Sequence, residues 1–248
     1  MRTTKIIALL AGLLLSTSMW TAPAFADETI PQCQTTNFYR DGMNLTAAVI
    51  ASGDVTGQIN ATGCDIGVYV PSGVTGVTVT GDVSGAKYFG VLVDDGSASV
   101  TGATIHDIGD SPLFDGAQHG VGIYFTNGAT GSVENSTVDN YQKGGIVASG
   151  NGTNVTISGN TVTGLGPVNF IAQNGIQVSY GAVGTVRGNN ISDNFYTGTV
   201  GVGPNSGGQN PPGWQYISAG LLLYQAGPGT DNSMNHFSAN QRNVAVVP

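Results

Sequence analysis

The sequence predicts an all-β solenoid, in which short strands are wound into stacked coils. Glycine accounts for 39 of the 248 residues, and only 9% of the residues are charged. Short apolar segments that begin with Gly or Asn recur along the chain, and Gly and Asn also occupy the turns between them. Beyond the first residues, no stretch has the 3.6-residue periodicity of an amphipathic helix.

The first 26 residues have the pattern of a secretory signal peptide. Arg2 and Lys5 form a basic start, residues 6–15 an apolar core, and Ala24-Phe25-Ala26 a cleavage site with small residues. The apolar run is shorter than the roughly 20 residues of a membrane span, and no later stretch approaches that length. We therefore expect a secreted protein, extracellular, periplasmic or on the cell surface, without a membrane span.

Removal of the leader leaves five basic residues against fifteen acidic ones, a net charge of −10. This charge argues strongly against a nucleic-acid partner, and less strongly against a highly anionic polymer.

Cys33 and Cys64 are the only cysteines, and in an oxidising compartment they predict one disulfide. We assign residues 27–63 to an N-terminal cap, whose apolar run 45–51 would cover the open end of the solenoid, and residues 64–248 to the solenoid domain.

The repeat has a period near 23 residues. Apolar segments begin at residues 67, 90, 122, 145, 175, 220 and 243, so the spacings are 23, 32, 23, 30, 45 and 23. One coil cannot bury its inward face alone, whereas stacked coils share a continuous core. Asparagines at equivalent corners (Asn160, Asn190 and Asn135) suit left-handed turns, and stacked Asn side chains can form hydrogen-bonded ladders.

Two segments carry a family resemblance. Gly-Asn-Asn-Ile-Ser-Asp-Asn at residues 188–194 and Gly-Ile-Gln-Val at residues 175–178 resemble the coil repeat of the pectate-lyase-like superfamily. The resemblance covers residue 63 to the C-terminus and implies a right-handed, single-stranded parallel β-helix of about seven to eight coils. That superfamily includes lyases, hydrolases, epimerases, phage tailspikes and adhesins, so the resemblance implies no single function.

The extra residues enter at one corner of the coil. The distance from each apolar segment to the next repeated unit stays between 10 and 12 residues, whereas the return to the following segment varies from 11 to 34. Insertions at one corner of a solenoid project from one face, which is usually the binding face. The loops 107–119, 165–173 and 194–218 flank a short return and therefore predict a cleft.

Tyr141 and Lys143 would form the floor of this cleft, because residues two apart face the same side of an extended chain. His119 would lie on an acidic wall. The candidates for substrate binding on the other wall are Gln173, Asn174, Tyr196, Trp214 and Tyr216. The aromatic residues could stack on sugar rings, and Trp214 could equally hold its own loop against the sheet.

Asp107, Asp110 and Asp115 allow three interpretations. They could act as general acid and base on a glycosidic bond, bind Ca²⁺, or form turns within their own loop. Ca²⁺ is the one cofactor that this pattern suggests, and the two cysteines do not form a zinc site. His119 could serve as an acid or base near neutral pH, or hydrogen-bond its own turn. Lys143 or Tyr141 could remove a proton beside a uronate carboxylate.

The sequence favours a monomeric, secreted protein that acts on an uncharged or mildly acidic extracellular polysaccharide as a hydrolase, lyase or epimerase. The alternative is a non-catalytic protein that binds glycan through the same face. An ice-binding surface is disfavoured, because the loops are irregular. Two carboxylates about 5–9.5 Å apart in one groove would indicate hydrolysis, whereas carboxylates bonded to their own loop would indicate a binding protein.

Overall fold

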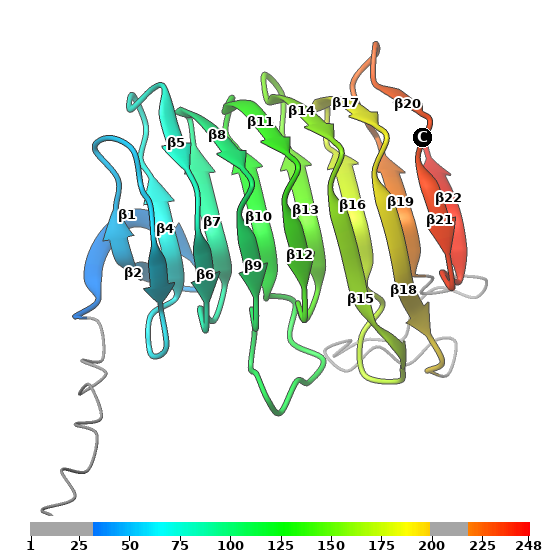
Figure 1. Ribbon diagram of the computed structural model, residues 1–248, viewed down its shortest axis with the longest axis horizontal. Helices are drawn as coiled ribbons and strands as arrows, with labels where there is room; N and C mark the ends of the chain where they lie inside the picture. Colours follow the sequence, from blue (N-terminus) through cyan, green and yellow to red (C-terminus); the bar gives the residue numbers. More distant parts are fainter. Residues whose placement is uncertain (1–31, 199–217) are drawn as a thin grey trace, which may run out of the picture.

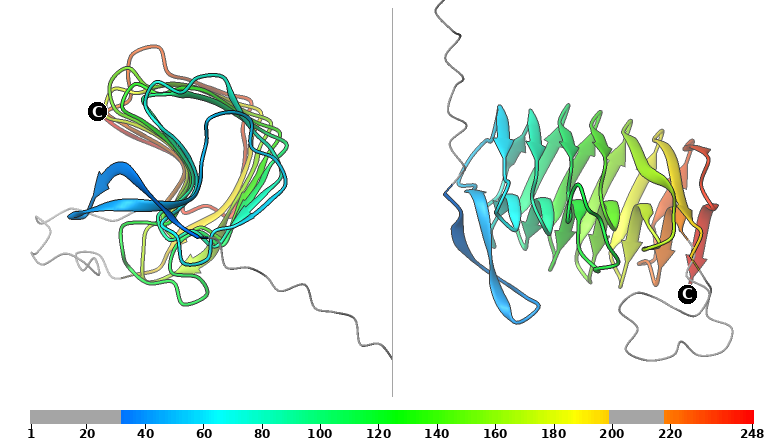
Figure 2. Two further views of the ribbon diagram at one scale, coloured as in Figure 1. Left: turned by 90° about the vertical axis from the view of Figure 1, so that its left-hand side faces the viewer. Right: turned by 90° about the horizontal axis from the view of Figure 1, so that it is seen from below.

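The computed structural model describes residues 32–198 and 218–248, and every regular element within these residues is a β-strand. The strands wind into a regular stack of coils (Figure 1). Seen along the stack, successive coils nearly superimpose, and a hairpin at the N-terminal end projects to one side (Figure 2). The predicted all-β solenoid is confirmed.

Three sheets, here called A, B and C, run along the stack. Sheet A contains β1 (Gln34–Arg40), β2 (Met43–Ile50), β4 (Ile66–Val70), β7 (Phe89–Asp94), β10 (Val121–Thr126), β13 (Gly144–Ser149), β16 (Asn174–Ser179), β19 (Ala219–Tyr224) and β22 (Arg242–Val247). Sheet B contains β5 (Val77–Val79), β8 (Ser97–Thr101), β11 (Thr130–Glu134), β14 (Asn154–Ser158), β17 (Val183–Arg187) and β20 (Asp231–Ser233). Sheet C contains β3 (Gln58–Asn60), β6 (Asp82–Ser84), β9 (Thr104–His106), β12 (Thr137–Asp139), β15 (Thr161–Val168), β18 (Asn190–Tyr196) and β21 (His236–Ser238).

Neighbouring strands pair in parallel, as in the β10–β13 and β11–β14 pairs, and β1 alone among the described strands pairs antiparallel, with β2. Six coils, from β4–β5–β6 to β19–β20–β21, have one strand in each sheet. Partial coils at β2–β3 and β22 complete the described stack. The prediction of about seven to eight coils is confirmed.

The glycine that opens six of the seven apolar segments is required by close packing between sheets A and C. A Cβ on Gly122 would lie 2.5 Å from the Val138 side chain and 2.7 Å from the carbonyl oxygen of Gly145. A Cβ on Gly145 would lie 2.5 Å from both Val162 and the carbonyl oxygen of Gly175. The β-branched residue of sheet C therefore packs directly on the backbone of sheet A in the same coil.

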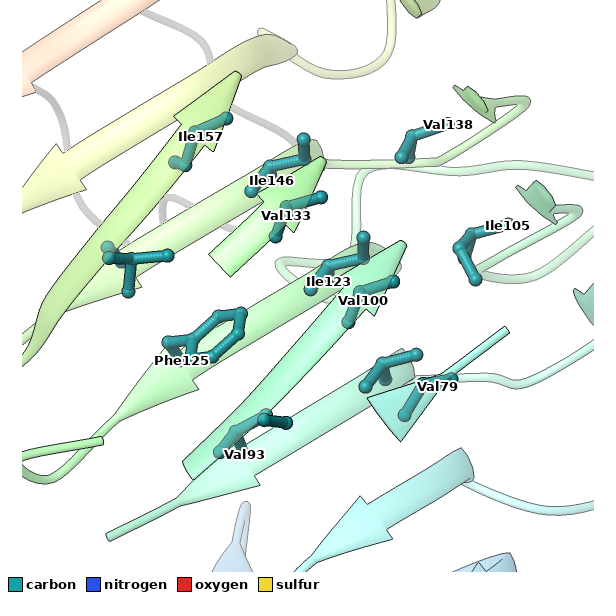
Figure 3. Packing of buried hydrophobic residues seen from close by; sticks show 14 of the residues in the cluster. Val79, Val93, Val100, Ile105, Ile123, Phe125, Val133, Val138, Ile146 and Ile157 are labelled. Carbon is teal, nitrogen blue, oxygen red and sulfur yellow. The ribbon is translucent and has the colours of Figure 1, made fainter. Parts of the chain in front are cut away.

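The interior is filled by β-branched and small apolar residues in rows along the stack. Ile123 and Ile146 are paired neighbours in sheet A, and Val100 and Val133 are paired neighbours in sheet B. All four are fully buried and face one another across the core (Figure 3). Each additional coil extends these rows and buries the apolar face of the coil before it.

An asparagine ladder connects coils at the corner between sheets B and C. Nδ2 of Asn160 donates to Oδ1 of Asn189 at 2.9 Å, and Nδ2 of Asn189 donates to Oδ1 of Asn235 at 2.9 Å. Asn160 and Asn189 are completely buried. The ladder satisfies polar groups that the coil turn brings into the interior.

The predicted positions in this ladder need one correction. Gly159 and Gly188, with φ of 67° and 63°, adopt the left-handed turn, and Asn160 follows that turn rather than forming it. Asn190 is exposed and lies one residue beyond the ladder. Asn135 does adopt the predicted left-handed conformation, with φ of 49°.

The corner between sheets C and A carries the long insertions, as predicted. Each described connection from sheet B to sheet C has two residues, and those from sheet A to sheet B have two to six. The connections from sheet C to sheet A range from three residues before β22 to fourteen before β10 and twenty-two before β19. Residues 107–120 form the longest of these loops that the structure describes completely.

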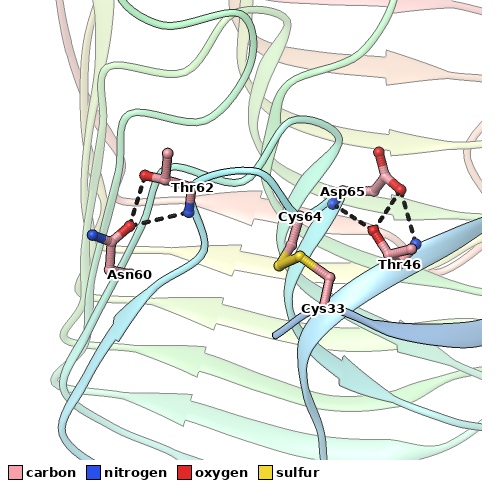
Figure 4. The surroundings of a disulfide bond; sticks show 6 residues. All are labelled: Cys33, Thr46, Asn60, Thr62, Cys64 and Asp65. Carbon is pink, nitrogen blue, oxygen red and sulfur yellow. Dashed lines mark hydrogen bonds between the residues drawn. A yellow bond between two sulfur atoms is a disulfide. The ribbon is translucent and has the colours of Figure 1, made fainter. Parts of the chain in front are cut away.

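The N-terminal segment is tied to the stack by the predicted disulfide. Cys33 and Cys64 are bonded, with their Cα atoms 5.5 Å apart. Nearby, the backbone N and Oγ1 of Thr46 donate to Oδ2 of Asp65 at 2.8 and 2.9 Å (Figure 4). The apolar run 45–51 is not a lid over the end of the core, because β2 is itself a strand of sheet A and pairs with β4.

Candidate functional site

A shallow groove of about 220 Å³ lies on the outer face of sheet A, and we call it the sheet A groove. Its floor is formed by the outward side chains of β10, β13 and β16. Tyr124, Val147 and Gln177 are paired in register across these three strands, so they form one row about 5 Å apart. The residues that line the groove are Arg40, Phe89, Gln118, Val121, Tyr124, Lys143, Gly144, Val147, Ser149, Gln177 and Tyr180.

The two sides of the groove come from different corners of the coil. Gln118 and Lys143 lie where sheet C returns to sheet A, and Ser149 and Tyr180 lie where sheet A leads into sheet B. Tyr180 is 56% exposed, and its ring meets that of Tyr224 edge-on with centroids 5.1 Å apart. Aromatic, amide, hydroxyl and ammonium groups therefore face one concave surface.

The groove is positive in an otherwise acidic protein. Arg40 and Lys143, two of the five basic residues after the leader, line it, and no carboxylate does so. Nζ of Lys143 donates to the carbonyl oxygen of Ala172 at 2.9 Å, and no carboxylate within the described residues pairs with it. Burial lowers the pKa of Lys143 to about 8.

The acidic loop 107–120 lies beside the groove, and its aspartates face other partners. Oδ1 of Asp115 accepts from the backbone N of Ala117 at 2.7 Å and from Nε2 of Gln142 at 3.2 Å. Gln142 is fully buried, and its Oε1 accepts from the backbone N of Asp110 at 2.9 Å. The side chain of Gln142 thus holds the loop in place, a role that the sequence analysis did not predict.

Asp110 and His119 form a pair within this loop. Nε2 of His119 lies 2.7 Å from Oδ2 of Asp110, and Nζ of Lys87 lies 3.7 Å from the other carboxylate oxygen. His119 is only 8% exposed, and its ring packs against that of Tyr88 with centroids 4.7 Å apart. Asp110 faces a separate hollow lined by Lys87 and residues 62–65, so the pair does not line the sheet A groove.

Asp107 belongs to a cluster on the outer face of sheet C. His106 places Nδ1 at 2.6 Å from Asp107 and Nε2 at 3.2 Å from Asp82, and Nδ2 of Asn140 donates to Asp107. Burial acts to lower the pKa of His106, but the hydrogen bond to Asp107 and the charges of both carboxylates outweigh it and raise the pKa. Burial raises the pKa of nearby Asp139, and His106 opposes that shift.

The prediction that Tyr141 shares the groove floor with Lys143 is wrong. Tyr141 is fully buried in the core, and its hydroxyl donates to Oδ1 of Asn194 at 2.7 Å. Burial raises the pKa of Tyr141 far above its ordinary value. The chain bends at Gln142 and Lys143, before β13 begins, so the alternation of an extended segment does not apply. Lys143 does line the groove.

The opposite wall was also placed incorrectly where the structure describes it. Gln173 is fully buried, and its Nε2 donates to the carbonyl oxygen of Tyr141 at 2.6 Å. Asn174 and Tyr196 are 6% and 5% exposed, and Oδ1 of Asn174 accepts from the backbone N of Ala219. These residues support the coil from inside. Trp214 and Tyr216 lie outside the described residues.

Within residues 32–198 and 218–248, no three His, Cys, Asp or Glu side chains are arranged to hold a metal ion. Asp107, Asp110 and Asp115 each face a different set of partners, so they do not converge on one Ca²⁺ position. The same part of the chain contains no helix long and apolar enough to cross a membrane.

Tyr124, Val147, Gln177, Tyr180 and Arg40 were not among the predicted site residues. The first three occupy the middle of the repeated apolar segments, where alternation along a strand directs every second side chain outward. That pattern could have identified the row, because it recurs at the same position of successive coils. Arg40 reaches the groove from the hairpin, and no repeat in the sequence indicates this.

Comparison with known proteins agrees with the architecture. Residues 33–211 match a family model described as a right handed beta helix region. No curated protein and no solved structure shows a significant match to the chain. The family match covers most of the sequence, and the described strands form the stacked parallel sheets of such a region. The chain therefore belongs to the right-handed β-helix family.

Proposed function

We propose that this protein binds an extracellular polysaccharide, uncharged or mildly acidic, in the sheet A groove. The observation that carries the proposal is the lining. It combines the ring of Tyr124, the amide of Gln177, the hydroxyl of Ser149 and the ammonium of Lys143 on adjacent coils. A mostly apolar concave surface with a few convergent polar groups is typical of ligand sites. Sugar rings present both C–H faces and hydroxyl groups to such a surface.

The positions of the carboxylates favour binding over hydrolysis. A glycosidase requires two carboxyl groups on either side of the bond that it cleaves. Asp115 bonds within its own loop and to Gln142, and Asp110 is engaged by His119 and Lys87. Asp107 bonds to His106 and Asn140. No carboxylate lines the groove.

A second candidate function is β-elimination on a uronate polymer, which the lowered pKa of Lys143 favours. The neutral amine would remove the proton beside the uronate carboxylate. The electron pair of that C–H bond would form a carbon–carbon double bond, and the glycosidic oxygen would leave with a proton from solvent. An unsaturated uronate would accumulate, and its ultraviolet absorbance reports this reaction directly.

Export is part of the proposed function. The N-terminal leader pattern and the Cys33–Cys64 disulfide both support an oxidising compartment outside the cytoplasm. Sequencing the N-terminus of the protein recovered from the culture medium or periplasm tests this part. A mature protein that begins near Asp27 is expected, and full-length protein retained in the cytoplasm would contradict it.

Affinity electrophoresis tests the proposal, with partly methyl-esterified pectin, xylan or galactan cast into native gels. Lys143→Ala and Tyr124→Ala should each weaken binding at least about fivefold, which corresponds to about 1 kcal/mol. Thr156→Ala is the control, because Thr156 is exposed on sheet B, away from the groove. It should bind as the wild type does.

If none of the three polymers retards the wild-type protein, the proposal fails. It also fails if Thr156→Ala loses binding while both groove variants retain it, because the ligand would then occupy another face. If unsaturated uronate accumulates with the wild-type protein and not with Lys143→Ala, the protein is a lyase, and the second candidate function replaces the first.

A further inference from the structure

We infer that the β1–β2 hairpin closes one end of the sheet A groove, so that the protein binds the end of a polysaccharide chain rather than its interior. The inference rests on the proposed function and adds the part of the polymer that the groove accepts.

The hairpin leaves the plane of sheet A and crosses its outer face. β2 pairs with β4, and β4 separates β2 from β7 in the sheet order. Phe38 of β1 nevertheless meets the ring of Phe89 in β7 edge-on, with centroids 5.9 Å apart. The guanidinium of Arg40 lies 5.3 Å from the centroid of the same ring, and Nη2 donates to the carbonyl oxygen of Gln118 at 3.2 Å. β1 therefore spans β4 and β7 and ends against loop 107–120.

The exposure of one row of side chains shows where the groove begins. Tyr69, Leu92, Tyr124, Val147, Gln177 and Leu222 occupy equivalent outward positions on β4, β7, β10, β13, β16 and β19. Tyr69 and Leu92 are 3% and 0% exposed, although they point away from the interior of the solenoid. Tyr124, Gln177 and Leu222 are partly exposed, and Val147, which lies between the first two, is 6% exposed. The row is thus covered on β4 and β7, and partly exposed side chains occur in it only from β10 onward.

The side chains that cover the first coils come from the hairpin. Leu45 and Ala47 of β2 are completely buried in a cluster with Leu92 and Phe89, on the outer side of sheet A. Phe38 packs against the same cluster. This cluster is separate from the interior core and fills the space that a continuation of the groove would need.

The hairpin is anchored at its base, so it acts as a fixed wall. The Cys33–Cys64 disulfide joins the start of β1 to the chain before β4. Two hydrogen bonds from Thr46 to Asp65 hold β2 against the same segment (Figure 4). In the views of Figure 2, the hairpin stands at the N-terminal end of the stack and projects from the side on which sheet A lies.

Within residues 32–198 and 218–248, a chain laid along the solenoid axis meets a wall at the N-terminal end only. Over β10, β13 and β16 it would contact the groove floor, and the next position toward the N-terminal end is occupied by Phe38 and Arg40. In the other direction, the outward side chains of β19 and β22, Leu222 and Ala245, are partly exposed. The groove therefore accepts one terminus of the polymer, and Arg40 is the charged group that faces it.

The test uses xylohexaose and galactohexaose in three forms. One form is free, one carries a bulky fluorophore on the reducing end, and one carries a benzyl ether on the terminal residue at the other end. Isothermal titration should show that one of the two blocks weakens binding at least about tenfold, whereas the other changes it by less than about twofold. Longer xylan chains should bind one protein each, whatever their length.

The Arg40→Ala variant tests the contribution of the hairpin to binding, and Arg187→Ala is its control. Arg40 lies 3.8 Å from a carboxylate oxygen of Asp41. Arg187 is likewise paired with an aspartate, Asp231, but lies on sheet B. Arg40→Ala should weaken binding of the free hexasaccharide. It should also reduce the difference in affinity between the two blocked forms. Arg187→Ala should leave both unchanged.

The inference is overturned if both blocked forms bind as tightly as the free sugar, or if several proteins bind along one long chain, because the groove is then open at both ends. The inference is also overturned if both blocked forms bind much more weakly than the free sugar, because the groove would then be closed at both ends. If neither free hexasaccharide binds but the polymers retard the protein, the inference of chain-end binding fails and the proposed function stands. If neither hexasaccharides nor polymers bind, the proposed function fails as well.

Discussion

Asn189→Ala removes the middle member of the asparagine ladder and should be strongly destabilising. Oδ1 of Asn189 accepts from the backbone N of Asn160 at 3.0 Å and from its Nδ2 at 2.9 Å. Nδ2 of Asn189 donates to the carbonyl oxygen of Ile157 at 3.0 Å and to Asn235. Alanine cannot replace any of these four hydrogen bonds.

The magnitude follows from burial. Asn160 is fully buried, so its backbone N–H loses its partner where water cannot reach it easily. An unsatisfied buried donor costs about 1–3 kcal/mol, and each lost hydrogen bond contributes about 1 kcal/mol net. We expect a loss of about 3 kcal/mol, which corresponds to a fall in Tm of about 6–12 °C for a protein of this size.

Thermal unfolding followed by circular dichroism measures this, with Asn190→Ala as the matched control. Asn190 is the next residue and is exposed, so its substitution should change stability by less than about 0.5 kcal/mol. Equal changes in Tm for the two variants would refute the reasoning, as would a change of less than about 2 °C for Asn189→Ala. In either case the hydrogen bonds of the ladder would contribute less to the free energy of unfolding than their geometry implies.

Two further predictions concern the stack. Because the folded pKa of His106 is raised, its stabilisation is complete below the unfolded value of about 6.5 and is lost as pH rises through the folded value. Urea denaturation should therefore show that His106→Gln costs more stability near pH 5.5 than near pH 9. Thr156→Ala, which replaces an exposed residue without a titratable group, should show no such difference, and a pH-independent cost for His106→Gln would contradict the prediction. Replacing Cys33 and Cys64, which are 31 residues apart, with serine should cost about 3.5 kcal/mol in the same assay, and an unchanged denaturation midpoint would show that the hairpin is held without the disulfide.

The fold could be predicted largely from the sequence, because a solenoid converts position along the chain into position in space. Each coil contacts only its neighbours, so a repeat in the sequence corresponds directly to a row in the structure. The glycines of the apolar segments, exemplified by Gly122 and Gly145, recur because each accommodates a sheet C side chain of its own coil. The insertion corner was predictable for the same reason, since only one of three connections varies widely in length.

The individual site residues were less predictable, because side-chain direction at a corner depends on the local turn. Tyr141 and Lys143 are two residues apart, yet one enters the core and the other reaches the groove, because the chain bends at residues 142 and 143. Gln173 likewise points inward to the backbone at Tyr141. Amide and phenol groups in such turns can satisfy buried backbone, and residue type alone does not distinguish this role from ligand contact.

The coil period, the disulfide pair and the corner that takes insertions could be inferred from the amino-acid sequence, since each depends on spacing along the chain. The position of the groove on the outer face of sheet A and the reach of Arg40 into it depend on tertiary packing. Arg40 and Gln118 are 78 residues apart and lie outside any repeat, and they meet because the hairpin folds back across two coils. A contact of that kind depends on the packing of Phe38 and Leu45 against sheet A, which no local pattern in the sequence encodes.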